Sequence, residues 1–149
     1  TSVLADGYLV AGSLTEEQER FLFGYGAYLQ LLDDVQDVQD DAVVGQKTIY
    51  SNFSPLIDLD TLANKTFAFG DSVIALYEKS ANEAANAYVD IIQKSVRLML
   101  IEAICFAKED FSPRYLLILE KHSPFRFKIL RDLKKRHQPY YMSMFGKVL

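Results

Sequence analysis

The stretch GAYLQLLDDVQDVQDD, residues 26–41, decides how this chain is interpreted, because it holds five aspartates and no basic residue. At about 100° per residue, its first glycine, its first glutamine and its aspartates fall within about 120° of one helical face. The polar residues of the stretch thus lie on one side and its apolar residues on the other, which predicts one long amphipathic helix from about residue 16 to residue 40. The apolar residues expected on its opposite side are Leu31, Leu32, Val35 and Val38.

The flanking sequence predicts an all-α fold. Thr15 and Gln18 fit a capping box at the start of the acidic helix. Hydrophobic spacing predicts further helices over about 2–12, 59–79 and 82–108. Only 7 Gly and 4 Pro occur in 149 residues, which favours long helices over turn-rich β structure. We therefore expect about six helices and a single domain over residues 1–149.

Local signals place the remaining boundaries. Two shorter helices are expected to begin at Ser112-Pro113 and Ser123-Pro124, because proline after a serine cap favours a helix start. Pro139 is expected to end the last helix. Residues 42–55 contain Gly, Ser, Asn and Pro and are typical of a loop.

The acidic helix is locally unfavourable. Aspartate is a poor helix former, like charges four residues apart repel, and negative charge opposes the dipole near a helix C-terminus. Such violations are expected at functional sites, and bound cations would remove the repulsion. Rigid carboxylates suit Mg²⁺, which keeps several waters and is bound through one or two carboxylates together with substrate phosphates. The alternative is an acidic helix face that lies in solvent.

The same face changes character along the helix. Below the aspartates come Gln30 and Gly26, and then Phe23 and Leu22. A surface that is acidic at one end, open at a glycine and apolar beyond it suits a ligand with an anionic head and a hydrocarbon tail. Phe23 and Leu22 could equally be ordinary core residues.

The segment from Gln30 to Asp37 resembles the second aspartate-rich motif of trans-isoprenyl diphosphate synthases, which reads Gln, two residues, Asp-Asp-x-x-Asp. The resemblance implies a class I terpenoid synthase-type helical bundle and a Mg²⁺-dependent transferase of isoprenoid biosynthesis that takes prenyl diphosphates. It implies that Asp33, Asp34 and Asp37 bind Mg²⁺, with Asp33 and Asp37 foremost in catalysis. Gln30 would orient a ligand or the cation. Gly45, Lys47 and Thr48 look like the elements that follow the motif, so Lys47 would contact the diphosphate.

A second resemblance overlaps the first. Residues 37–45 look like the second motif of squalene and phytoene synthases, with Asp-Val, an acidic pair, and a glycine after three residues. In that alternative Asp37 and Asp41 would bind Mg²⁺, and two prenyl diphosphates would be joined head to head. Gln46 stands where that family usually has a basic residue.

Both families use two acidic motifs on facing helices in chains about twice this length. This chain has one such motif and begins at Thr1. We therefore expect it to be the C-terminal half of a larger isoprenoid synthase domain and to be inactive alone. Its expected partners are the missing N-terminal half and, as in many family members, a second copy in a homodimer.

Composition excludes several other classes. Residues 1–75 carry a net charge of −9, which argues against a nucleic acid partner, and the net charge of residues 76–149 is +5. No apolar run reaches the length of a membrane span, and no signal peptide is visible. The lone cysteine, Cys105, is expected in the core, and a cytoplasmic location follows from these features. His122 and His137 are expected on the surface.

Two readings without this chemistry stay open. A helical relative that has lost catalysis could act as a binding protein, and the missing first motif supports it. A Ca²⁺-binding helix is disfavoured, because Ca²⁺ loops need backbone carbonyls and a turn glycine.

Overall fold

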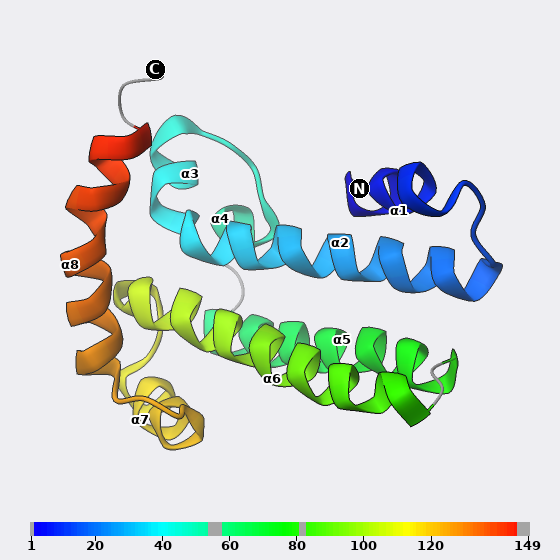
Figure 1. The fold of residues 1–149 in the computed structure, drawn as a ribbon. Coiled ribbons are helices and arrows are strands. Elements are labelled where there is room, and N and C mark those ends of the chain that lie inside the picture. Colours follow the sequence, from blue (N-terminus) through cyan, green and yellow to red (C-terminus); the bar gives the residue numbers. More distant parts are fainter. Residues whose placement is uncertain (1, 54–57, 81–82, 146–149) are drawn as a thin grey trace.

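The computed structural model describes residues 2–53, 58–80 and 83–145. These residues form eight α-helices and one short 3₁₀ helix, with no strand among them, which confirms the all-α prediction (Figure 1). The elements are α1 (Ser2–Ala11), α2 (Glu16–Gln36), α3 (Val38–Val44), α4 (Ile49–Phe53), α5 (Leu59–Ser80), α6 (Glu83–Phe106), η1 (Lys108–Asp110), α7 (Pro113–His122) and α8 (Phe127–Phe145).

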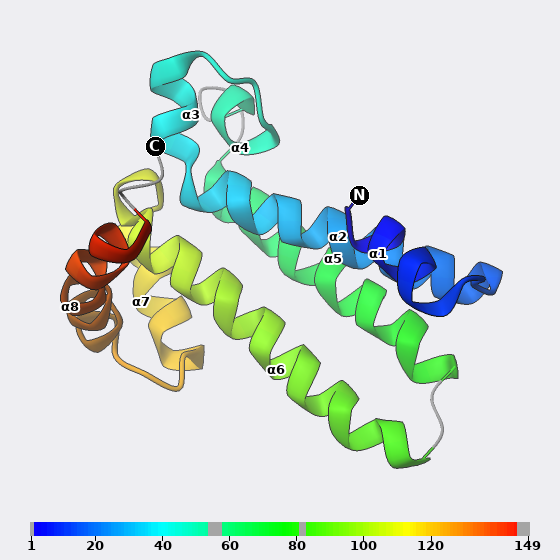
Figure 2. The ribbon, with the colours of Figure 1, turned by 45° about the horizontal axis from the view of Figure 1, so that its top comes forward.

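Three long helices, α2, α5 and α6, form the body of the molecule, and α2 packs against both of the others. Figures 1 and 2 show α1 lying along α2, α3 and α4 beyond the C-terminal end of α2, and α8 crossing one end of the body. The largest fully buried side chains are Tyr28, Tyr50, Leu100, Ile104, Val35 and Cys105. Cys105 is fully buried as predicted, and its Sγ lies 3.7 Å from the backbone oxygen of Phe127 at the start of α8.

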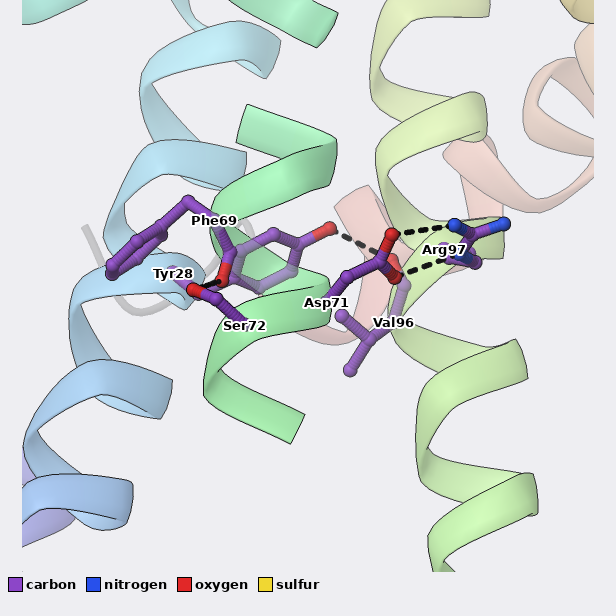
Figure 3. Close-up of polar contacts among 6 residues, drawn as sticks. All are labelled: Tyr28, Phe69, Asp71, Ser72, Val96 and Arg97. Carbon is purple, nitrogen blue, oxygen red and sulfur yellow. Dashed lines mark hydrogen bonds and ion pairs between the residues drawn. The ribbon is translucent and has the colours of Figure 1, made fainter. Parts of the chain in front are cut away.

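The centre of the body is a close approach between α2 and α5. Gly70 leaves room for the ring of Tyr28, since a Cβ atom built on this glycine would lie 2.5 Å from the ring atom Cε2. The Tyr28 hydroxyl then reaches α6, where it donates a hydrogen bond of 3.2 Å to the backbone oxygen of Val96 (Figure 3). One side chain thus ties all three long helices together.

The polar side chains near Tyr28 have hydrogen-bond or ion-pair partners. Arg97 of α6 forms an ion pair of 2.6 Å with Asp71 of α5, and the hydroxyl of Ser72 donates to the backbone oxygen of Phe69 (Figure 3). Within the described residues, no buried side-chain nitrogen or oxygen lacks a hydrogen-bond partner. This part of the body is therefore built from matched groups, as a stable interior requires.

Capping residues fix the helix ends. Thr15 and Gln18 form the predicted capping box, in which each side chain accepts from the other residue's backbone N–H. Ser112 caps α7 at the predicted position, with Pro113 as the first helical residue. The Asp60 carboxylate accepts hydrogen bonds from both the N–H and the hydroxyl of Ser112, which anchors the start of α7 on the start of α5.

Four boundary predictions were wrong. The acidic helix does not continue to Asp40, because it breaks at Asp37, whose backbone angles (φ −102°, ψ 11°) lie in the sparsely populated bridge region. Residues 42–55 are not wholly a loop. The helix α3 extends to Val44, and α4 starts at Ile49, because the Thr48 side chain accepts the Ser51 N–H.

The other two errors concern α8. Ser123 does not begin a helix, because its hydroxyl binds the backbone N–H and oxygen of Phe125. The helix starts instead at Phe127, whose N–H is bound by the Glu120 carboxylate at 2.8 Å. Pro139 does not end α8, which continues to Phe145 although a proline inside a helix normally kinks or breaks it.

Candidate functional site

The acidic segment lies where α2 passes into α3. Two backbone hydrogen bonds keep the helical spacing of four residues across the break: Asp37 N–H to Asp33 O at 3.0 Å, and Asp41 N–H to Asp37 O at 2.7 Å. The chain then continues in a new direction as α3, beside α4 (Figures 1 and 2). The aspartates therefore lie around a bend between two helices and not along one straight helix.

Burial divides the five aspartates into two sets. Asp34 and Asp41 are buried, each with 8% of its surface exposed, whereas Asp33, Asp37 and Asp40 are exposed. A carboxylate that is removed from water needs compensating partners. Asp34 has two: the side-chain amide of Gln30, which donates at 3.2 Å, and the backbone N–H of Ile49.

These contacts do not fully offset burial. Burial raises the pKa of Asp34, and the charges of Asp41 and Asp33 raise it further, while the bonds from Gln30 and Ile49 act in the opposite direction. The pKa of Asp37 is raised as well, first by burial and then by the neighbouring aspartates. The aspartates of this segment therefore repel one another, and a bound cation would reduce this repulsion.

One basic residue faces this segment from the far end of the chain. The charge of Lys134 in α8 acts against the upward shift in the pKa of Asp37, and its ammonium group lies 4.1 Å from the centre of the Phe106 ring. The helix α8 packs on α6 and passes close to α3 (Figure 1). Sequence reasoning placed the basic residues near the C-terminus on a solvated face, and it did not detect that one of them approaches the acidic bend.

A pocket of about 480 Å³ opens beside the buried carboxylate. Gln30 and Asp34 form its polar side, and Phe69 of α5 and Ile49 of α4 contribute apolar surface across from α2. The pocket lining therefore combines polar and apolar side chains. Its complete lining is Ser2, Gly26, Ala27, Gln30, Leu31, Asp34, Ile49 and Phe69.

The structure brings together only some of the predicted site residues. Gln30, Gly26 and Asp34 share the pocket as their helical spacing indicates. Phe23 is 56% exposed and is not part of the lining, so the apolar surface comes from other residues. Lys47 is exposed in the connection between α3 and α4.

Five lining residues were not predicted: Ser2, Ala27, Leu31, Ile49 and Phe69. Leu31 was expected on the side of the helix opposite the aspartates, yet it lines this pocket together with Asp34. Ile49 lies in a segment that was interpreted as a loop, and Phe69 lies on a different helix, 35 positions after Asp34. Periodicity along one helix cannot show which residues of another helix lie opposite. Of the two histidines, His122 is exposed as expected, while the side chain of His137 lies outside the described part.

The predicted Mg²⁺ ligands are not gathered into one cluster by the described structure. In the part of the chain that the structure describes, no three side chains of His, Cys, Asp or Glu are grouped to hold a metal ion by themselves. Mg²⁺ is commonly held by one or two carboxylates, waters and phosphate oxygens, and does not need a protein cage. The charges that raise the pKa of Asp34 are those of Asp41 and Asp33, and those that raise the pKa of Asp37 are Asp33, Asp41 and Asp40, so Mg²⁺ binding at this segment stays a prediction.

Comparison with known proteins identifies no relative. No protein-family model matches the chain, and no curated protein and no solved structure matches it significantly. Over the described residues, no helix combines the length and the apolar composition that crossing a bilayer requires.

Proposed function

We propose that this chain carries the second aspartate-rich half of an isoprenyl diphosphate synthase-like transferase and binds prenyl diphosphates through Mg²⁺. The observation that carries the proposal is the pocket of about 480 Å³, where the buried carboxylate of Asp34 meets an apolar lining from three helices. An anionic head attached to a hydrocarbon is the ligand that such a surface complements.

The residues have different roles in this proposal. Asp33 and Asp37 are the foremost Mg²⁺ ligands in this proposal, followed by Asp34 and Asp41, with one or two carboxylates for each ion and the remaining ligands supplied by water and the diphosphate. Gln30 fixes the Asp34 carboxylate through its hydrogen bond. Bound Mg²⁺ would supply Lewis-acid stabilisation of the departing diphosphate.

The basic and apolar residues complete the site. In this proposal Lys47 contacts the diphosphate, as the resemblance implies, and Lys134, whose charge acts to lower the pKa of Asp37, adds positive charge near the bend. Phe69 and Leu31 line the hydrocarbon portion and keep water from the reacting carbon.

Calorimetric titration of the chain with farnesyl diphosphate, with and without Mg²⁺, tests the proposal. We expect binding that needs Mg²⁺ and that falls at least tenfold in Asp34→Asn. The matched control is Asp90→Asn, which removes an exposed carboxylate of α6 that pairs with Lys94 far from the pocket and should leave the affinity unchanged. Equal affinity in all three proteins would contradict the assignment.

A second variant tests binding of the hydrocarbon tail separately from binding of the diphosphate head group. Ala27→Leu fills the apolar part of the pocket without changing charge. It should weaken farnesyl diphosphate but leave Mg²⁺-dependent binding of inorganic pyrophosphate intact. Parallel loss of both ligands would instead mean that the substitution disturbs the fold.

Products distinguish the alternatives once binding is established. Farnesyl diphosphate with isopentenyl diphosphate should give longer prenyl diphosphates, while a hydrocarbon from farnesyl diphosphate alone would indicate the squalene and phytoene type of coupling. Tight binding without turnover, measured on the complete protein that contains this chain, would favour a non-catalytic binding protein.

A further inference from the structure

The end of the molecule formed by α7, α8 and their connection is strongly basic. Residues 121–136 hold seven lysines and arginines and one acidic residue, Asp132, which gives a net charge of +6. Arg131 contacts the Cys105 thiol, and Lys134 lies over Phe106. The other five side chains are exposed, and within the described residues none of them forms an ion pair: Lys121, Arg126, Lys128, Lys135 and Arg136.

Large apolar side chains lie exposed among these charges. Phe125, Ile129 and Leu133 follow one another at intervals of four residues, with exposures of 48%, 48% and 42%. In α7, Leu117 and Ile118 are 65% and 47% exposed, and Arg114 and Lys121 are exposed on the same helix. Single exposed hydrophobic residues are ordinary, but Phe125, Ile129 and Leu133 recur every four residues among cations that form no ion pair within the described residues, and together with those cations they make a basic apolar surface.

We propose that this basic apolar surface docks the protein on an anionic phospholipid bilayer. Helices that lie at a membrane interface combine lysine and arginine with large apolar side chains that enter the headgroup boundary. Positive charge alone would serve nucleic acid equally well, because phosphate contacts need only cations. The exposed Phe125, Ile129 and Leu133 decide for the bilayer, since a duplex backbone offers no apolar medium to receive them.

The inner face of α8 is already occupied, which leaves only its outer face for docking. Phe127 and Leu130 are buried against the body, with 5% and 3% of their surface exposed. Binding therefore requires no unfolding of α8 and no separation of α8 from α6. The helix would lie on the bilayer surface while the rest of the molecule stays in water.

Vesicle co-sedimentation of the whole chain tests the proposal, using phosphatidylcholine alone and a 70:30 mixture with phosphatidylglycerol. We expect binding only to the anionic vesicles and its loss at high salt. The double variant Lys128→Glu/Lys135→Glu should bind at least tenfold more weakly, since each basic residue near an anionic surface contributes on the order of a fivefold effect. The control Arg20→Glu/Lys65→Glu makes the same charge change on α2 and α5 and should bind normally.

A second pair of substitutions tests the apolar contribution. Ile129→Ser/Leu133→Ser keeps every charge, and both positions are exposed, so the fold should survive, as circular dichroism can verify. We expect severalfold weaker vesicle binding. Unchanged binding of this variant, equal binding of the two charge variants, or binding of duplex RNA but not of vesicles would each overturn the proposal.

Discussion

Two regions of α2 differ in how far the chain itself compensates their buried polar groups. Around Tyr28 the ring fills the space above Gly70, and the hydroxyl is bonded to Val96. Two turns later, Asp34 is equally removed from solvent, yet repulsion from Asp41 and Asp33 adds to burial in raising its pKa. The first region is complete within the chain, whereas the second would gain stability from a cation that the chain itself does not supply.

The largest expected effect on stability comes from a substitution in the packed core, which is complete within the chain. Leu100 is fully buried in the core between α6 and its neighbours, so Leu100→Ala should lower the free energy of unfolding by about 2–5 kcal/mol. Urea denaturation followed by circular dichroism measures this change. A loss below about 1 kcal/mol would mean that the packing around α6 is looser than described.

A smaller effect is expected where α2 and α5 meet. In Gly70→Ala the new methyl group would overlap the Tyr28 ring, and overpacking of this kind lowers stability by about 1–3 kcal/mol. The matched control is Ala68→Gly, which changes an exposed position of the same helix and should cost about 1 kcal/mol through helix propensity alone. If Gly70→Ala were neutral, the ring could move aside freely.

The smallest effect, of opposite sign, is expected at the acidic bend. The raised pKa of Asp34 means that the folded state binds protons more tightly than the unfolded state, so stability falls as pH rises above the ordinary carboxyl range. Without Mg²⁺, Asp34→Asn should therefore be more stable than the original protein at pH 7, by on the order of 0.5 kcal/mol. The difference should vanish below about pH 3, where the carboxyl is protonated in both the folded and the unfolded state.

Thermal unfolding at several pH values measures this difference. A variant less stable than the original protein at pH 7 would show that the bonds from Gln30 and Ile49 outweigh the repulsion. Adding Mg²⁺ together with pyrophosphate should stabilise the original protein and not the variant, which joins the stability measurement to the proposed function.

Much of the fold could be predicted from local signals. The capping box at Thr15 and the Ser112-Pro113 start depend on residues within one turn, so the sequence shows them directly. The helices α5 and α6 follow from hydrophobic spacing. The break at Asp37 could not be predicted in this way, because the same periodic pattern continues on both sides of it. The start of α8 was misplaced because the Ser123 hydroxyl binds a neighbouring turn.

The candidate site was predictable only along α2. Helical spacing correctly grouped Gly26, Gln30 and Asp34, because these residues follow one another at intervals of four. Phe69 and Lys134 approach the same region from α5 and α8, and their positions depend on how the helices pack. Since no related sequence supplied information about that packing, only the structure could reveal these two residues.

The buried Cys105 thiol allows local opening of the protein to be measured. It is the only cysteine in the chain, and burial raises the pKa of its thiol, which disfavours the reactive thiolate. A water-soluble alkylating reagent could reach the sulfur only after the start of α8 had moved away from α6. The rate of labelling would therefore record how often this end of the molecule opens, without any substitution or added probe.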